Sequence, residues 1–199
     1  MVLFFFGSFN PISIAHLKLA KYSLDVLKYE KVIFIPCSNQ YIVETNREVF
    51  QAQLRLKLLQ LVQKSNPWME INDMEINSHK SIRTYSSLIK LKQLGYKGKL
   101  LLGADNVMQL EHSWKYVENI CKEFGIVCLE RSELNISNCI SKDKYLSKLS
   151  KYIEVIQGPK EFQNISSTEI RKLIKEKNYT KLKDFVPNEV YNYFRSVHE

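Results

Sequence analysis

The sequence has no long apolar run, and this sets the first limit on the class of protein. Its longest apolar run, VLFFF at residues 2–6, is too short to span a bilayer or to form the core of a signal peptide. No internal repeat and no low-complexity linker occurs in the 199 residues. We therefore expect a soluble protein of the cytoplasm, with the nucleus as the alternative, and no membrane partner.

The sequence is also poor in cysteine and lacks the spacing of a zinc site. Cys37, Cys121, Cys128 and Cys139 form no closely spaced pair, and no histidine follows them at ligand distance. We interpret these cysteines as reduced thiols at small core positions, and we expect no metal site built from protein side chains.

Acidic residues are too few to balance the basic ones. The chain carries 29 Lys and Arg against 21 Asp and Glu, which gives a net charge of +8. The lysines are spread along the chain, and neither an RNP-like aromatic motif nor a zinc-finger spacing is present. The charge therefore favours a phosphate-bearing substrate and no nucleic-acid partner, with plain solubility as the alternative.

Short continuous apolar runs recur along the chain and predict the strands of a sheet. A content of 45 % hydrophobic and 12 % aromatic residues excludes disorder. The expected strands lie at residues 2–6, 31–36, 99–103, 125–130 and 153–157, with a weaker one at 68–73. Because these runs are continuous rather than alternating, we expect a parallel sheet that is covered on both faces.

Segments with a helical period lie between these runs, at residues 16–27, 50–62 and 86–94. This alternation is typical of an α/β fold with an open parallel sheet and helices on both faces. We predict a single domain over residues 1–199, of which 159–199 is a helical C-terminal portion. The helices expected there lie at 167–177, near Leu182 and at 188–197.

The sequence GSFNPISIAH follows the first expected strand and has the features of an anion site. In open α/β sheets, ligands bind beyond the carboxyl ends of the strands. Gly7 lets a ligand approach the backbone, Ser13 can cap the next helix, and His16 lies in its first turn. The N–H groups and the dipole at a helix start favour phosphate. A capped helix with a surface histidine is the alternative.

The sequence ISSTEIR, late in the chain, forms a second candidate anion site. Ser166 and Glu169 have the spacing of a capping box. Ser167 and Arg171 are four residues apart and share one helix face, and Thr168 adds a second hydroxyl. Two such sites at one edge of the sheet predict a polyphosphate that is held at both ends.

Together the two motifs resemble those of the nucleotidyltransferase superfamily, which carries a (H/T)xxH signature after its first strand and an ISSTxxR signature late in the chain. GSFNPISIAH resembles the first signature, and ISSTEIR matches the second. Within the superfamily, the chain is most similar to the nicotinate or nicotinamide mononucleotide adenylyltransferases. The stretches LRLKLLQL, RTYSSL, LLGADNVMQLEHSW and VPNEVYNYF resemble further segments of that family, so the resemblance spans nearly the whole chain.

The resemblance implies a Rossmann-like fold and an enzyme of NAD biosynthesis. Such an enzyme transfers AMP from ATP to nicotinate mononucleotide, and also to nicotinamide mononucleotide, and releases pyrophosphate. Mg²⁺ would be bound mainly through the ATP phosphates. His16 and Arg171 would be the catalytic residues. The residues implied for ATP binding are Gly7, Ser8, Phe9, Ser13, His16, Gly103, Asp105, Ser166, Ser167, Thr168 and Arg171. Those implied for the mononucleotide are Asn39, Thr84, Trp114 and Arg131.

The sequence also departs from the family pattern. Ser13 stands where many members have the first histidine, and residues 40–46 lack the P-H-K/R element of bacterial members. The alternatives are another nucleotidyltransferase, such as a pantetheine-phosphate adenylyltransferase or a cytidylyltransferase, a catalytically silent nucleotide-binding module, and a basic RNA-binding protein. The sequence leaves a homo-oligomer open.

Overall fold

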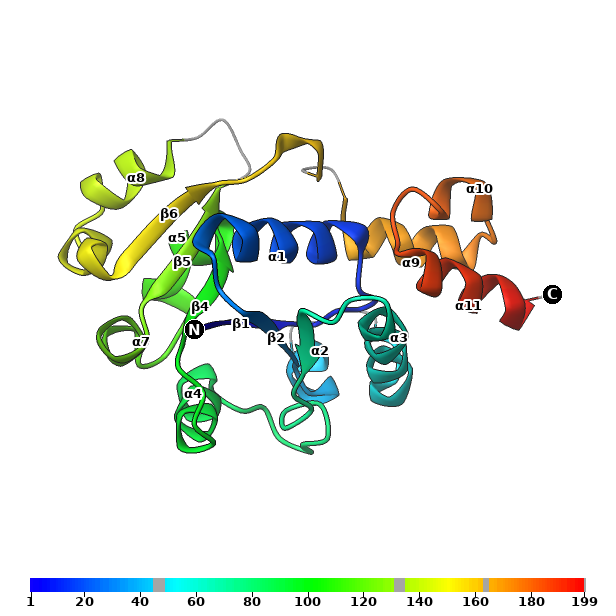
Figure 1. Ribbon diagram of the computed structural model, residues 1–199, viewed down its shortest axis with the longest axis horizontal. Coiled ribbons are helices and arrows are strands. Elements are labelled where there is room, and N and C mark those ends of the chain that lie inside the picture. Colours follow the sequence, from blue (N-terminus) through cyan, green and yellow to red (C-terminus); the bar gives the residue numbers. More distant parts are fainter. Residues whose placement is uncertain (45–48, 131–134, 163–164, 199) are drawn as a thin grey trace.

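The computed structural model describes residues 1–44, 49–130, 135–162 and 165–198 (Figure 1). In these ranges, six strands form one parallel sheet in the order β3-β2-β1-β4-β5-β6. The strands are β1 (Val2–Gly7), β2 (Lys31–Pro36), β3 (Met69–Ile71), β4 (Gly98–Gly103), β5 (Ile126–Glu130) and β6 (Ile153–Gln157). The predicted strands and the open parallel sheet are confirmed, and the weaker run at 68–73 forms the short edge strand β3.

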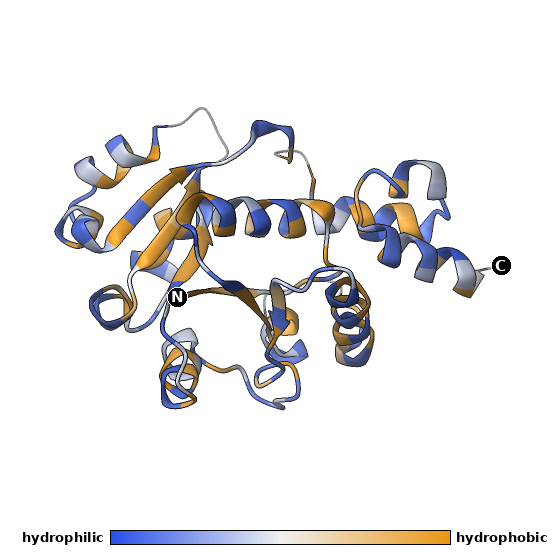
Figure 2. Cartoon of the chain, in the orientation of Figure 1, coloured by the Kyte–Doolittle hydropathy of each residue, from blue (hydrophilic) through white to orange (hydrophobic). Residues whose placement is uncertain are grey.

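Both faces of the sheet are buried because neighbouring residues of a strand point to opposite sides. In β1, Leu3 joins the core on one face and Phe4 joins the core on the other. In β2, Phe34 and Ile33 divide in the same way. This arrangement explains the continuous apolar runs, and in Figure 2 the strands are accordingly coloured as hydrophobic.

Helices cover the sheet on both sides, as predicted. One core takes apolar side chains from α1 (Ile14–Leu27), α3 (Ala52–Lys64), α9 (Ser167–Lys175), α10 (Tyr179–Leu182) and α11 (Asn188–His198). The other takes them from α4 (Thr84–Gln93), α5 (Ala104–Met108), α6 (Leu110–Ser113), α7 (Val117–Glu123), α8 (Ile136–Lys142) and η1 (Leu146–Tyr152). The remaining helices are α2 (Asn39–Glu44) and η2 (Lys160–Phe162). Of the helices in the described ranges, none is both long and apolar enough to cross a membrane.

The last three helices lie beyond the carboxyl end of the sheet and pack next to the start of α1 (Figure 1). The backbone N–H of Ile14, the first residue of α1, donates to the carbonyl of Phe185 at 2.9 Å. The ring of Phe194 in α11 packs against Phe50, with ring centroids 5.8 Å apart. α9 itself, which carries the second motif, contacts the loop of the first motif through Ser167 and Arg171.

Candidate active site

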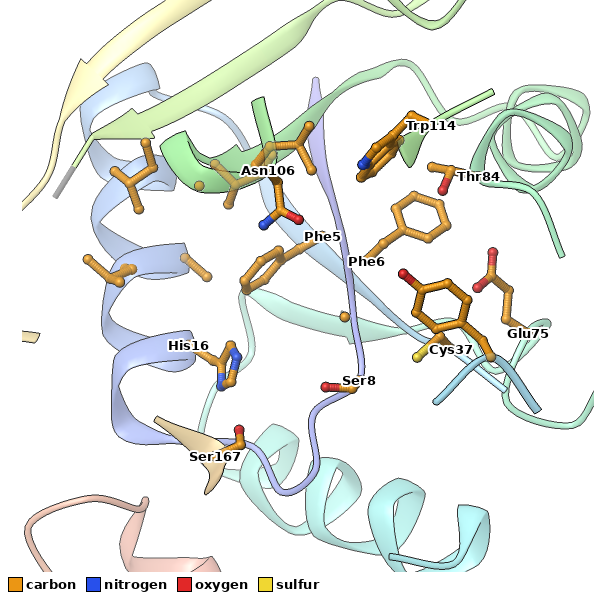
Figure 3. Close-up of a pocket in the computed structure, with 18 of the residues that line it drawn as sticks. Phe5, Phe6, Ser8, His16, Cys37, Glu75, Thr84, Asn106, Trp114 and Ser167 are labelled. Atoms are coloured by element: carbon orange, nitrogen blue, oxygen red, sulfur yellow. The ribbon is translucent and has the colours of Figure 1, made fainter. Parts of the chain in front are cut away.

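A cavity of about 450 Å³ opens at the carboxyl ends of β1 and β4 (Figure 3). His16 and Ser167 lie at one end of it, whereas Thr84, Trp114 and Glu75 lie at the other (Figure 3). Of the residues implied for substrate binding, those that line the cavity are Gly7, Ser8, Ser13, His16, Thr84, Gly103, Trp114, Ser166 and Ser167. Both motifs therefore contribute to a single cavity.

Phe9 gives the loop after β1 its shape. Its side chain is fully buried and its φ is 40°, in the left-handed region. The ring lies against Gly7, where an added Cβ would come within 2.9 Å of Phe9 Cζ. The need for glycine at position 7 therefore comes from the Phe9 ring as well as from any approaching ligand. Phe9, which the resemblance implied for ATP binding, is fully buried and does not line the cavity.

Ser13 and His16 form a reciprocal cap at the start of α1. The His16 backbone N–H donates to Ser13 Oγ at 3.2 Å, and the Ser13 backbone N–H donates to Nδ1 of the His16 ring at 3.1 Å. Because a backbone N–H can only donate, Nδ1 must be an acceptor here, and the ring proton resides on Nε2. Ser13 thus replaces the first histidine of the signature with a cap that orients the second.

The second motif is anchored to the first. Ser166 caps α9 by accepting from the Glu169 backbone N–H at 3.2 Å, which is the serine half of the predicted capping box. The Ser167 hydroxyl donates to the Pro11 carbonyl at 3.2 Å. Arg171 donates from Nη1 to the carbonyls of Asn10 at 2.9 Å and Ser167 at 3.1 Å.

Arg171 and Thr168 lie behind this edge of the cavity. Nη2 of Arg171 donates to Thr168 Oγ1 at 3.2 Å. Neither side chain lines the cavity, whereas the start of α9 does, through Ser166 and Ser167. In this structure Arg171 therefore links the loop after β1 to the start of α9.

Gly103 and Asp105 differ in their relation to the cavity. Gly103 is the N-cap residue of α5 and lines the cavity, and a Cβ added there would meet no atom within 4 Å. Asp105 is exposed and does not line it. The neighbouring Asn106 does, and its amide points inward (Figure 3). Asn106 was not predicted, because both residues fall in the first turn of a helix of only five residues.

The other end of the cavity holds the residues implied for the mononucleotide. Thr84 begins α4, and Trp114 follows α6. Asn39 lies outside the cavity lining, and its Oδ1 accepts a hydrogen bond from Arg55 at 2.7 Å. Arg131 lies outside the described residues.

Glu75 lines the cavity but was not among the predicted site residues. Its side chain is 5 % exposed, and one carboxylate oxygen accepts a short hydrogen bond from the Ser87 hydroxyl. Burial raises the pKa of this carboxyl to about 7, while the Ser87 hydrogen bond and the charge of Lys90 act in the opposite direction. Residues 74–83 show no helical or strand period, so the burial of Glu75 could not be predicted.

The sequence profile of the cytidylyltransferase-like family matches residues 4–173. The chain belongs to the cytidylyltransferase-like family. It is 34 % identical over 178 residues to a probable nicotinate-nucleotide adenylyltransferase from Caldicellulosiruptor bescii, covering 88 % of this chain and 87 % of that protein. A second protein of that name, from Fusobacterium nucleatum, is 34 % identical over 176 residues and covers 86 % of each chain. The predicted family resemblance is confirmed.

A solved structure shares the fold of this cytidylyltransferase-like chain. The Plasmodium falciparum nicotinic acid mononucleotide adenylyltransferase complexed with NaAD superposes with a TM-score of 0.74 and 22 % identity. The superposition covers 98 % of this chain and 95 % of that one. The same enzyme complexed with APC superposes with a TM-score of 0.72. The predicted Rossmann-like fold is therefore confirmed.

The charges around the cavity of this cytidylyltransferase-like protein suit a phosphorylated ligand. Arg83 and Lys115 line it as exposed cations, and the starts of α1 and α9 add backbone N–H groups. Within the described residues, no group of three or more His, Cys, Asp or Glu side chains could hold a metal ion. A divalent ion carried by the phosphates of a nucleotide fits such a site, because Mg²⁺ commonly keeps its water and binds through substrate phosphates.

Proposed function

We propose that the protein transfers AMP from ATP to nicotinate mononucleotide, and more slowly to nicotinamide mononucleotide, and releases pyrophosphate. One observation supports this proposal above all: the starts of α1 and α9 lie at one end of the cavity, and Thr84 and Trp114 lie at the other end. Two helix starts at one end of the cavity suit a triphosphate, and an aromatic wall at the other end suits a pyridine ring. The names of the relatives favour nicotinate.

In the proposed reaction, the phosphate of the mononucleotide attacks the α-phosphorus of ATP. This phosphate is largely dianionic at neutral pH, since its second pKa is about 6, so the reaction needs no general base. The protein has to align the two phosphates and to stabilise the charge that develops on the pyrophosphate. His16 donates from Nε2, because Ser13 holds its Nδ1.

The helix starts supply further donors to the triphosphate. Backbone N–H groups at the start of α9, next to the lining residues Ser166 and Ser167, lie at the same end of the cavity as His16. Arg171 keeps the two loops together through Asn10 and adds positive charge behind them. Mg²⁺, when bound to the ATP phosphates, supplies charge neutralisation, and no side-chain cage is required for it.

The acceptor end can distinguish the two pyridine mononucleotides by charge. Nicotinate differs from nicotinamide by a carboxylate. Arg83 and Lys115 favour this carboxylate, whereas an ionised Glu75 opposes it. We place the enzyme in the cytoplasm and assign its net positive charge to these phosphorylated substrates rather than to nucleic acid.

The test is pyrophosphate release by the purified protein with ATP, Mg²⁺ and nicotinate mononucleotide, with the dinucleotide product identified by chromatography. Parallel reactions contain nicotinamide mononucleotide or pantetheine phosphate as acceptor, and CTP in place of ATP. We expect the highest kcat/KM with ATP and nicotinate mononucleotide. Turnover with pantetheine phosphate or CTP alone would assign another reaction of the superfamily, and ATP binding without any turnover would favour a nucleotide-binding module.

A further inference from the structure

Arg55 is a fully buried arginine that joins the loops after β1 and β2. Its Nη1 donates to the Ser8 carbonyl at 2.6 Å, and its Nη2 donates to the Cys37 carbonyl at 2.7 Å and to Asn39 Oδ1 at 2.7 Å. The two strands pair in register up to Gly7 and Pro36, so these loops begin side by side. Ser8 and Cys37 line the cavity (Figure 3), whereas Arg55 does not.

Packing alone does not explain an arginine at this position. Within the described residues, no ion pair includes Arg55, and its Nε is buried without a hydrogen-bond partner. Burial lowers the pKa of the guanidinium, which means that the site disfavours the charge. An apolar side chain on this face of α3 would avoid the desolvation of a charge.

The three contacts fix the direction of backbone donors in both loops. In a trans peptide, the carbonyl and the N–H point in opposite directions. The carbonyls of Ser8 and Cys37 point to Arg55, so the N–H groups of Phe9 and Ser38, both buried residues that do not themselves line the cavity, point away from it. Neither N–H group has a hydrogen-bond partner among the described residues. They form a pair of donors, one in the loop after each strand.

Asn39 is oriented in the same way. A guanidinium has only donors, so it binds the Oδ1 of the amide and turns the Nδ2 group away. One buried side chain thus orients a donor in the loop after β1 and two donors in the loop after β2.

We propose that Arg55 is a positioning residue for the transfer reaction. It fixes the distance between the loop that binds the ATP phosphates and the loop that binds the phosphate of the acceptor. Ser8 belongs to the first of these loops and Cys37 to the second, and both line the cavity. This inference rests on the proposed adenylyltransfer, because it is the alignment of two phosphates that Arg55 controls.

The first test is kinetic and uses Arg55→Lys. A lysine keeps the charge, but it lacks the planar fork that reaches three acceptors. We expect kcat to fall about 100-fold, which is the scale of a misplacement of about 1 Å, while both KM values change much less. Leu59→Ala, on the same helix and fully buried, is the matched control for destabilisation. A folded Arg55→Lys with wild-type kcat, or an equal loss of kcat in Leu59→Ala, overturns the inference.

A second test does not need turnover and keeps the inference separate from the proposed function. Amide signals of Phe9 and Ser38 are followed by NMR in the wild type. We expect the Phe9 signal to shift with a non-hydrolysable ATP analogue and the Ser38 signal to shift with nicotinate mononucleotide. If neither signal moves while the ligands bind, the positioning role fails even though the adenylyltransfer assay succeeds. If Arg55→Lys does not fold, Asn39→Ala replaces it, and an unchanged KM for the mononucleotide contradicts the inference.

Discussion

Arg171 donates from Nη1 to the backbone carbonyl of Asn10 at 2.9 Å and so links two motifs that are 161 residues apart in the chain. The Ser167 hydroxyl makes a second link, to the carbonyl of Pro11 at 3.2 Å. The arginine of the second motif is therefore anchored to the loop of the first. The proposed phosphate site would therefore draw on both motifs, which meet at one end of the cavity.

This link predicts that Arg171→Lys is not silent. A lysine cannot donate to Asn10, Ser167 and Thr168 together, and a lost hydrogen bond from a charged group is worth about 1.5–3 kcal/mol. We expect kcat/KM for ATP to fall by about tenfold or more. Steady-state kinetics with the exposed Lys172→Ala as control measures the effect. Unchanged kinetics in Arg171→Lys would show that the link plays no part in catalysis.

The two nitrogens of His16 can be tested separately. Asn at position 16 can replace the Nδ1 acceptor but cannot reach the Nε2 position, whereas Gln has the opposite geometry. We expect His16→Asn to keep the thermal stability of the wild type but to lose roughly 10²-fold in kcat. His16→Gln should keep more of kcat and lose stability, since the contact with the Ser13 N–H is broken. Near-normal kcat in His16→Asn would remove His16 from the reaction.

Gly7 and Phe9 form a pair whose coupling is measurable. An added Cβ at Gly7 would lie 2.9 Å from Phe9 Cζ, so Gly7→Ala should lower the free energy of unfolding by about 1–3 kcal/mol. Phe9→Leu should relieve part of this loss in the double variant. Urea unfolding of the four proteins gives the coupling energy. If the losses in the free energy of unfolding were strictly additive, the Phe9 ring would not determine the conformation of the loop after β1.

Gly103→Ala is the matched glycine control for that series. A Cβ at Gly103 meets no protein atom within 4 Å, so the Gly103→Ala protein should be as stable as the wild type. Because Gly103 lines the cavity, the same methyl group should raise the KM for ATP. If Gly103→Ala had the KM for ATP of the wild type, the nucleotide would not bind next to Gly103.

Glu75 makes folding stability depend on pH. Its pKa rises from 4.5 to about 7 on folding, so between these values the unfolded chain releases a proton that the folded protein retains. The free energy of unfolding should therefore fall as the pH rises through this interval, by about 3 kcal/mol in all, and this loss should be complete above pH 7. Glu75→Gln should remove this slope and be more stable than the wild type at pH 8.

Urea unfolding between pH 5 and pH 8 measures this contribution, with the exposed Glu176→Gln as control. The control should keep the slope of the wild type. Equal slopes in the wild type and in Glu75→Gln would show that the carboxyl of Glu75 titrates normally.

The fold was predictable because its central strands are buried on both faces. Phe4 and Phe34 belong to continuous apolar runs for this reason, and the period of α1 and α3 is that of helices with one buried side. The helices of four to seven residues between Ala104 and Lys142 were not predicted, since so few residues show no period. The division into one domain with a helical portion at 159–199 stays a prediction.

The site was predictable only where the role of a residue depends on its neighbours in the sequence. Ser13 and Ser166 cap helices, and their position follows from the motif alone. The buried ring of Phe9 depends on a left-handed backbone conformation that no neighbouring residue signals. Arg55 did leave a signal, because Leu58, Leu59 and Val62 follow it at helical spacing and place it on the buried stripe of α3.

The most direct test of the account is the structure of the protein with a non-hydrolysable ATP analogue. We predict a single triphosphate between the starts of α1 and α9, with Nε2 of His16 on one side and the backbone N–H groups next to Ser166 and Ser167 on the other. An analogue whose phosphates contact only one of these helix starts, or lie at another surface, would contradict the shared phosphate site.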